Sequence, residues 1–87
     1  MKPLLLISML LISAPVFASA NCPAHPKEEW APEDTLKKAL QDEGYAIKKF
    51  QVDGNCYEIY GLDPKGQKVE IYFDPKTLGI IKAETYR

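Results

Sequence analysis

Two cysteines, one histidine and a pair of glutamates are the side chains of this sequence best suited to chemistry. Cys22 and His25 are near neighbours in a proline-containing segment, and Cys56 lies far along the chain. A free cysteine beside a histidine could act as a nucleophile with its base, or both could ligate zinc. Zinc sites are almost always four-coordinate, and this chain has no Cys-x-x-Cys motif and no second histidine. A complete zinc shell would therefore have to borrow carboxylates.

The remaining residues offer little to an enzyme. All three serines lie in the first 19 residues, so the rest of the chain cannot build a Ser-His-Asp triad. Glu58 and Glu70 could in principle share glycosidase chemistry, but a domain this small offers little of the concave pocket that such chemistry needs. The glycines form no phosphate-binding loop. We expect no catalytic residue, no bound metal and no cofactor.

The first twenty residues have the pattern of a secretory signal peptide. Lys2 precedes an apolar run over 4–12, and Ala18-Ser19-Ala20 provides the small residues that a signal peptidase reads. The run is shorter than the roughly 20 residues that span a bilayer. We predict cleavage after Ala20 and release into the periplasm or the medium. A retained membrane anchor and a lipoprotein modified at Cys22 are the alternatives, the latter disfavoured by Asn21.

Export decides how the two cysteines are interpreted. An even pair in a small exported chain is typical of a disulfide, so we predict the bond Cys22–Cys56, with two free thiols or metal ligation as the alternatives.

The whole chain has 11 basic and 12 acidic side chains, and only Lys2 lies in the predicted signal peptide. Both signs are interspersed, without the clustered Lys and Arg of a nucleic-acid interface. We expect no nucleic-acid partner and no membrane contact after cleavage.

The rest of the chain predicts a single α+β domain. Residues 21–31 form a proline-rich arm, and residues 32–87 form the domain. A helix begins at Pro32 and ends at Gly44. Its apolar face comprises Leu36, Ala39 and Leu40.

From Tyr45 onward the hydrophobic period changes from that of a helix to that of a strand. Strands are predicted at 47–52, 56–62, 69–73 and 80–86, and the short turns between them imply an antiparallel meander with the helix on one face. Ile47 is out of phase with Phe50 and Val52, which indicates a bulge near Lys48-Lys49 or a wrong register.

Strand alternation assigns the two faces of this sheet. The face beneath the helix carries Tyr57, Ile59, Val69, Ile71 and Phe73, with Ile81 and Ala83 beside them. The opposite face is expected to be open and is the candidate binding face; its members are Glu58, Tyr60, Glu70, Tyr72, Lys82 and Glu84. Ordinary cross-strand packing of aromatic residues is the competing interpretation. Cys56 falls on the same face, so an arm bonded to it would wrap round one end of the sheet and cover part of it.

Several of these segments resemble the PepSY family. They are Glu29-Trp30, Glu43-Gly44-Tyr45, the stretch 52–59 (VDGNCYEI) and the stretch 68–75 (KVEIYFDP), within a similarity over about residues 28–85. PepSY modules often close with Asp-Pro-x-Thr-Gly, whereas here Leu78 stands between Thr77 and Gly79. The resemblance implies a small α+β module, found in propeptides of thermolysin-type metallopeptidases and alone in exported proteins with a proposed peptidase-restraining role.

Taken together, the residues and the resemblance predict an exported, non-catalytic PepSY-like binding module. Its partner would be an exported protein or a peptide segment, such as a peptidase that it restrains, held on the open face or added as a strand to a sheet edge. A redox accessory that serves a haem or metal protein through Cys22, His25 or the tyrosines is the second hypothesis. A structural module without a ligand is the third.

Overall fold

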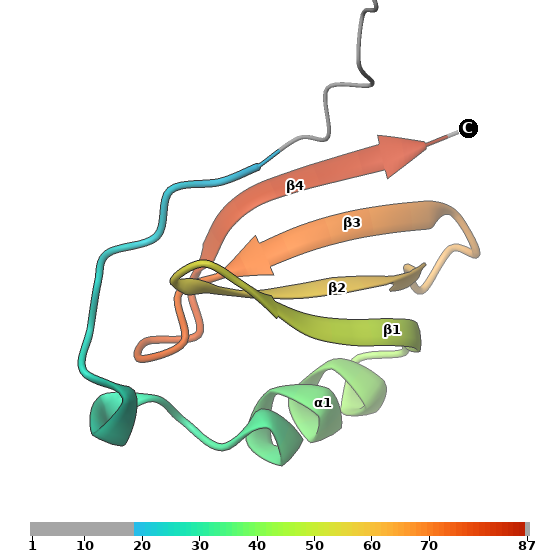
Figure 1. The fold of residues 1–87 in the computed structure, drawn as a ribbon. Helices are drawn as coiled ribbons and strands as arrows, with labels where there is room; N and C mark the ends of the chain where they lie inside the picture. The colour runs from blue at the N-terminus through green and yellow to red at the C-terminus, as the bar shows by residue number, and fades with distance from the viewer. Residues whose placement is uncertain (1–18, 87) are drawn as a thin grey trace, which may run out of the picture.

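A computed structural model describes residues 19–86, in which one α-helix packs on a four-stranded antiparallel sheet (Figure 1). The predicted α+β fold class and meander are confirmed, with strand order β1-β2-β3-β4. The predicted signal peptide lies almost wholly outside the described residues and stays a prediction. In chain order the elements are a 3-10 turn at Lys27–Glu29, α1 at Glu33–Asp42, β1 at Ala46–Asp53, β2 at Cys56–Leu62, β3 at Lys68–Phe73 and β4 at Ile80–Tyr86.

Helix α1 is stabilised at its ends by chain geometry rather than by a side-chain cap. Pro32 occupies the N-cap position without a side-chain hydrogen bond, and acidic residues follow in the first turn, where they favour the helix dipole. At the other end, Gly44 adopts φ +98°, the left-handed conformation that glycine accepts without steric cost. The N–H groups of Gly44 and Tyr45 donate to the carbonyls of Gln41 and Leu40, which is a Schellman ending. The sequence places the helix correctly.

The strand register contains two bulges. The β1–β2 pairing shifts between Ile47 and Lys49, so the predicted bulge near Lys48-Lys49 is confirmed. The β3–β4 pairing shifts as well: Tyr72 lies opposite Lys82 and Phe73 opposite Ile80, which leaves Ile81 as the extra residue. A bulge bends its strand and strengthens the local twist.

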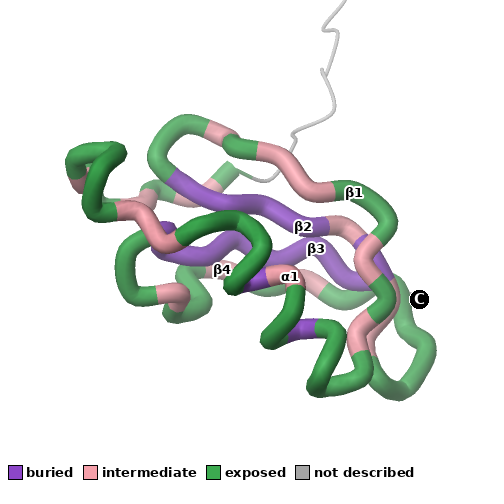
Figure 2. Tube along the Cα trace, turned by 90° about the horizontal axis from the view of Figure 1, so that it is seen from below, coloured by how far each residue is buried: buried purple, intermediate pink, exposed green. Residues whose placement is uncertain are grey.

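The core lies between α1 and the two central strands, which are the most buried part of the chain (Figure 2). Its fully buried members are Leu36, Leu40, Tyr57, Ile59, Val69, Ile71 and Phe73. The five sheet residues predicted to lie beneath the helix are thus all in the core. Trp30 closes one end, with its ring edge-on to Tyr57 at 5.3 Å between centroids.

Strand β4 departs from the prediction. Ile81 and Ala83 were expected beside the core, yet both are exposed, and Ile81 retains 41% of its surface. The backbone of α1 approaches β1 and makes no comparably close approach to β4. Local alternation assigned Ala83 to the correct face, but it could not show that a helix of ten residues covers only part of the sheet. Ala39, predicted on the apolar helix face, is exposed and lines a groove of about 190 Å³ that runs towards Ile80.

Gly61 in β2 provides a first test of this packing. A side-chain carbon at Gly61 would collide with the backbone of Ala46 and Ile47 in β1, next to the bulge. Overpacking of this kind costs about 1–3 kcal/mol, so we expect Gly61→Ala to lower the free energy of unfolding by that amount in urea denaturation. Gly79→Ala is the matched control, because its added carbon meets only the Thr77 hydroxyl. Equal stability of the two variants would contradict the close approach of β1 and β2.

Candidate functional site

The sheet face opposite α1, called the polar face below, brings the six predicted binding residues together. Cross-strand partners on it are Glu58 with Tyr72, Tyr60 with Glu70, Glu70 with Glu84, and Tyr72 with Lys82. These pairings come from three adjacent strands, β2, β3 and β4. The side chains therefore form one continuous patch, and its role in binding remains a proposal.

The expectation that this face is open is wrong at its centre. Glu58, Glu70 and Tyr72 expose 1%, 4% and 2% of their surfaces. Tyr60, Lys82 and Glu84 are half-buried and surround them. A partner could touch the rim of the patch, but it could not reach the two carboxylates without displacing part of the protein.

Part of this cover is the N-terminal arm. The predicted disulfide Cys22–Cys56 is present, with its Cα atoms 5.4 Å apart, and Cys56 is fully buried. The Lys82 ammonium donates to the Ser19 carbonyl at 3.4 Å, so the arm also reaches β4. Figure 1 shows the arm, in blue, passing round one end of the sheet on its way to α1. The wrapping expected from the position of Cys56 is confirmed.

Beneath the arm and the rim lies a hydrogen-bonded cluster centred on two carboxyl groups. Glu70 accepts hydrogen bonds from the Tyr72 hydroxyl at 3.0 Å and from the Tyr86 hydroxyl at 2.6 Å. Glu58 accepts one from the Gln51 side-chain amide at 2.7 Å. Among the described residues, every buried side-chain nitrogen and oxygen has a partner. The cluster therefore satisfies the polar groups that the sheet buries, as a stable interior requires.

The two carboxyl groups differ in acidity because they share a hydrogen bond. Burial, followed by that hydrogen bond with Glu70, raises the pKa of Glu58. Burial alone would also raise the pKa of Glu70, but hydrogen bonds from Glu58 and the surrounding tyrosines outweigh it and lower this pKa to about 2. Glu58 therefore holds the shared proton more tightly than Glu70 does. The pKa of Tyr86 rises to about 12, chiefly through its hydrogen bond to Glu70.

A proton shared by two carboxyl groups is the arrangement of an acid–base pair, but here both groups are shielded from any substrate. Sequence reasoning missed two members of the cluster, Gln51 and Tyr86. Both could have been found from the register, because Gln51 lies opposite Glu58 and Tyr86 follows Glu84 on the same strand face. The cluster ties the side chains of β1, β2, β3 and β4 together by hydrogen bonds.

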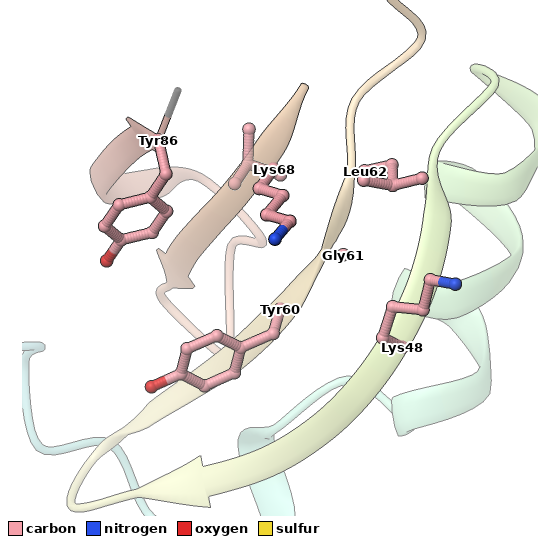
Figure 3. A pocket seen from close by; sticks show the side chains of 7 residues that line it. Lys48, Tyr60, Gly61, Leu62, Lys68 and Tyr86 are labelled. Atoms are coloured by element: carbon pink, nitrogen blue, oxygen red, sulfur yellow. The ribbon is translucent and has the colours of Figure 1, made fainter. Parts of the chain in front are cut away.

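The accessible part of the polar face is a pocket beyond the cluster, at the end of the strands farthest from the disulfide (Figure 3). It has a volume of about 220 Å³, and the rings of Tyr60 and Tyr86 stand beside it. Two lysines contribute to its lining, and the ammonium of a third, Lys49, lies 5.8 Å from the centre of the Tyr60 ring. The full lining is Lys48, Tyr60, Gly61, Leu62, Lys68, Val69 and Tyr86.

His25 is held by the fold rather than exposed on a loop. Its Nε2 lies 3.2 Å from a carboxylate oxygen of Asp74, which is itself buried. The other Asp74 oxygen accepts the backbone N–H of Lys76 at 2.8 Å. Burial would raise the pKa of Asp74, but the Lys76 N–H and the His25 ring outweigh it and lower this pKa. The pair ties the arm to the β3–β4 turn.

Neither a metal cluster nor a membrane span is present in residues 19–86. No group of three or more His, Cys, Asp or Glu side chains there could hold a metal ion. No helix in the same residues is long and apolar enough to cross a bilayer.

Comparison with known proteins assigns the chain to a family. Residues 3–84 match a family model described as the peptidase propeptide and YPEB domain, PepSY_2. The match covers nearly the whole chain, including most of the predicted signal peptide. No curated protein and no solved structure matches significantly.

Proposed function

Because the chain belongs to the peptidase propeptide and YPEB domain family, we propose that it is an exported, non-catalytic module that binds a peptide segment of a peptidase. The family description names peptidase propeptides, which supports a peptidase as the partner class. The disulfide Cys22–Cys56 fits an oxidising compartment, and the predicted signal peptide provides the route to it.

The observation that carries this proposal is the pocket beside Tyr60 and Tyr86. Small-molecule and cofactor sites usually enclose about 300–1,000 Å³. This pocket encloses about 220 Å³, which suits one side chain of a bound segment better than a whole cofactor. Tyrosine is enriched at protein interfaces because its ring is apolar and its hydroxyl can hydrogen-bond.

The charged residues around the pocket indicate which kind of peptide segment would bind there. Lys48 and Lys68 line it, and Leu62 adds apolar surface. Lysine is a strongly hydrated point charge that pairs readily with a carboxylate at a rim. The bound segment would therefore place an apolar side chain in the pocket and a carboxylate beside it.

The alternative functions find less support in the geometry. A redox accessory would act through Cys22, His25 or the tyrosines, but Cys22 is bonded to Cys56 and His25 contacts Asp74. The hydroxyls of Tyr72 and Tyr86 donate to Glu70. A purely structural module would not need an accessible apolar pocket bordered by lysines. The proposed site is the accessible end of the polar face, with Tyr60 retained from the sequence prediction and the buried Tyr72 set aside.

We expect the double variant Tyr60→Ala/Tyr86→Ala to bind at least about tenfold more weakly than the wild type, since buried aromatic anchors at interfaces commonly contribute 1–2 kcal/mol or more each. The assay adds purified oxidised protein to the exported fraction of the producing cells and follows peptidase cleavage of a quenched fluorescent peptide. The wild type should inhibit, and the double variant should require a higher concentration.

Val52→Ser is the matched control, because Val52 is an exposed apolar residue on β1 outside the pocket. It should inhibit like the wild type, and circular dichroism should show that all three proteins are folded. If the double variant inhibits as well as the wild type, the pocket is not the binding site. If the wild type does not inhibit, the protein does not restrain a peptidase. Cleavage of any substrate by the purified protein alone would show that it is an enzyme.

A further inference from the structure

Strand β4 is an edge strand of the sheet, and within residues 19–86 no strand pairs with its outer side (Figure 1). The opposite edge, β1, carries the bulge between Ile47 and Lys49 and lies close to α1, and both features discourage pairing with another strand. From Lys82 to Tyr86, β4 pairs regularly with β3. This regular stretch is the edge best prepared to accept another strand.

The side chains of this stretch are complementary to themselves. Lys82 and Glu84 lie on the polar face, where they form an ion pair at 3.5 Å, and Ala83 lies between them on the helix face. If two copies of β4 pair antiparallel about Ala83, each Lys82 lies directly opposite Glu84 of the second copy. Opposite charges at facing positions stabilise an antiparallel pair.

The competing registers lack this complementarity. A shift that centres the pair on Lys82 places two lysines face to face, and one that centres it on Glu84 places two glutamates face to face. Like charges directly opposite each other are destabilising. A shift by a single residue would pair each polar-face residue of one copy with a helix-face residue of the other. The charges therefore select one register.

Exposed apolar surface on β4 favours the same pairing. Ile80 and Ile81 expose 59% and 41% of their surfaces, although both lie within a strand. In the register centred on Ala83, Ile81 lies opposite Thr85 of the second copy. Two β-branched side chains at facing positions pack well on a pleated surface.

We propose that this protein forms a two-fold symmetric dimer through antiparallel pairing of β4, with the two Ala83 residues facing each other across the symmetry axis and two Lys82–Glu84 pairs across the interface. The axis is perpendicular to the sheet, so the two polar faces lie on the same side. Because the interface is one strand edge, the dimer is a weak one. This inference stands apart from the proposed function, since it rests on the Lys82–Glu84 pairs of the β4 edge and involves no peptidase; Tyr86 is the one residue that belongs to both the edge and the pocket.

Charge reversal provides the test. Sedimentation equilibrium of the oxidised protein, from about 10 μM to about 1 mM, should show a monomer–dimer equilibrium for the wild type. Lys82→Glu turns both pairs into Glu–Glu contacts, and Glu84→Lys turns both into Lys–Lys contacts. Each single variant should raise the dissociation constant about tenfold or more. The double variant Lys82→Glu/Glu84→Lys should return it to near the wild-type value.

Mixing the two single variants is the sharpest form of this experiment. Two copies of the same single variant repel each other, but one copy of each places Glu opposite Lys at both pairs. A heterodimer should therefore form at concentrations at which neither variant dimerises alone. Lys65→Glu, in the β2–β3 turn, makes the same charge change away from β4 and should leave dimerisation unchanged. A wild type that stays monomeric at the highest concentration overturns the proposal. A dimer that is indifferent to these reversals overturns this interface.

Discussion

Reduction of the Cys22–Cys56 disulfide should lower the free energy of unfolding by about 2–5 kcal/mol, the usual range for a small secreted domain. The bond joins residues 34 apart in sequence, so its loss frees a long loop in the unfolded chain. In the folded protein it holds the arm over the polar face beside the fully buried Cys56. A domain of this size has a thin core, so this loss is a large share of its stability.

Urea denaturation followed by circular dichroism, with and without reductant, measures this effect. The double variant Cys22→Ala/Cys56→Ala should match the reduced wild type, and reductant should then change nothing further. If reduction leaves the midpoint unchanged, the arm contributes no stability through its bond. Thiol labelling of denatured, unreduced protein should find no reactive cysteine.

The sequence was informative wherever a short-range rule decides the structure. The helix bounds follow from Pro32 and Gly44, and the strand bounds follow from the turns between them. The β1 bulge was visible because Ile47 breaks the alternation. Each of these features depends on residues a few positions apart, so local chain geometry determines it.

Features that depend on how far one element extends over another were not predictable in the same way. Alternation placed Glu58 and Tyr72 on the correct face, but it could not show that the arm and the side chains of β4, which are distant in sequence, lie over the same face. Exposure of Ile81 follows from a bulge in β4 and from the limited reach of α1. The pocket needed the registers of β2 against β3 and of β3 against β4, which together bring Tyr60 near Tyr86.

Leu78 shows how a departure from the family pattern is accommodated. It adopts φ +63°, a left-handed conformation that costs a non-glycine residue roughly 1–2 kcal/mol. Its side chain packs against the core, and its N–H donates to the Asp74 carbonyl at 2.7 Å. Burial of a leucine offsets a cost of this size. The turn therefore closes although Leu78 stands where the family pattern has glycine.

The second large effect concerns the buried carboxyl pair. Glu70→Gln should lower the free energy of unfolding at neutral pH, whereas Glu58→Gln should preserve the hydrogen bonds of the cluster. A glutamine at position 58 can donate to Glu70, as the protonated acid does, and can accept from Gln51. A glutamine at position 70 removes the charged acceptor of the Tyr72 and Tyr86 hydroxyls. Hydrogen bonds to a charged group contribute about 1.5–3 kcal/mol, so Glu70→Gln should lose at least that much stability at neutral pH.

The pH dependence separates the two carboxyl groups. The pKa of Glu58 is raised in the folded state, so its contribution is present in acid and is lost as pH rises through the raised value. The pKa of Glu70 is lowered from 4.5 to about 2, so its contribution is present above 4.5 and is lost as pH falls towards 2. The wild type should therefore lose stability at both ends of the range. Glu58→Gln should abolish the loss as pH rises, and Glu70→Gln should reduce the loss between 4.5 and 2 by the share that Glu70 contributes.

Urea denaturation of the wild type and both variants, repeated from pH 2 to pH 9, measures these slopes. Asp74 also has a lowered pKa, so every variant loses some stability in acid through Asp74. The contribution of Glu70 is therefore the difference in free energy of unfolding between Glu70→Gln and the wild type at the same low pH. Lys76→Ala is not a suitable control, because Lys76 forms an ion pair with Glu29. Gln67→Glu, on the exposed β2–β3 turn, adds a carboxylate without touching the cluster and should leave the high-pH slope as in the wild type. If Glu58→Gln keeps the high-pH loss, the shared proton does not reside on Glu58, and the donor and acceptor roles of the pair must be exchanged.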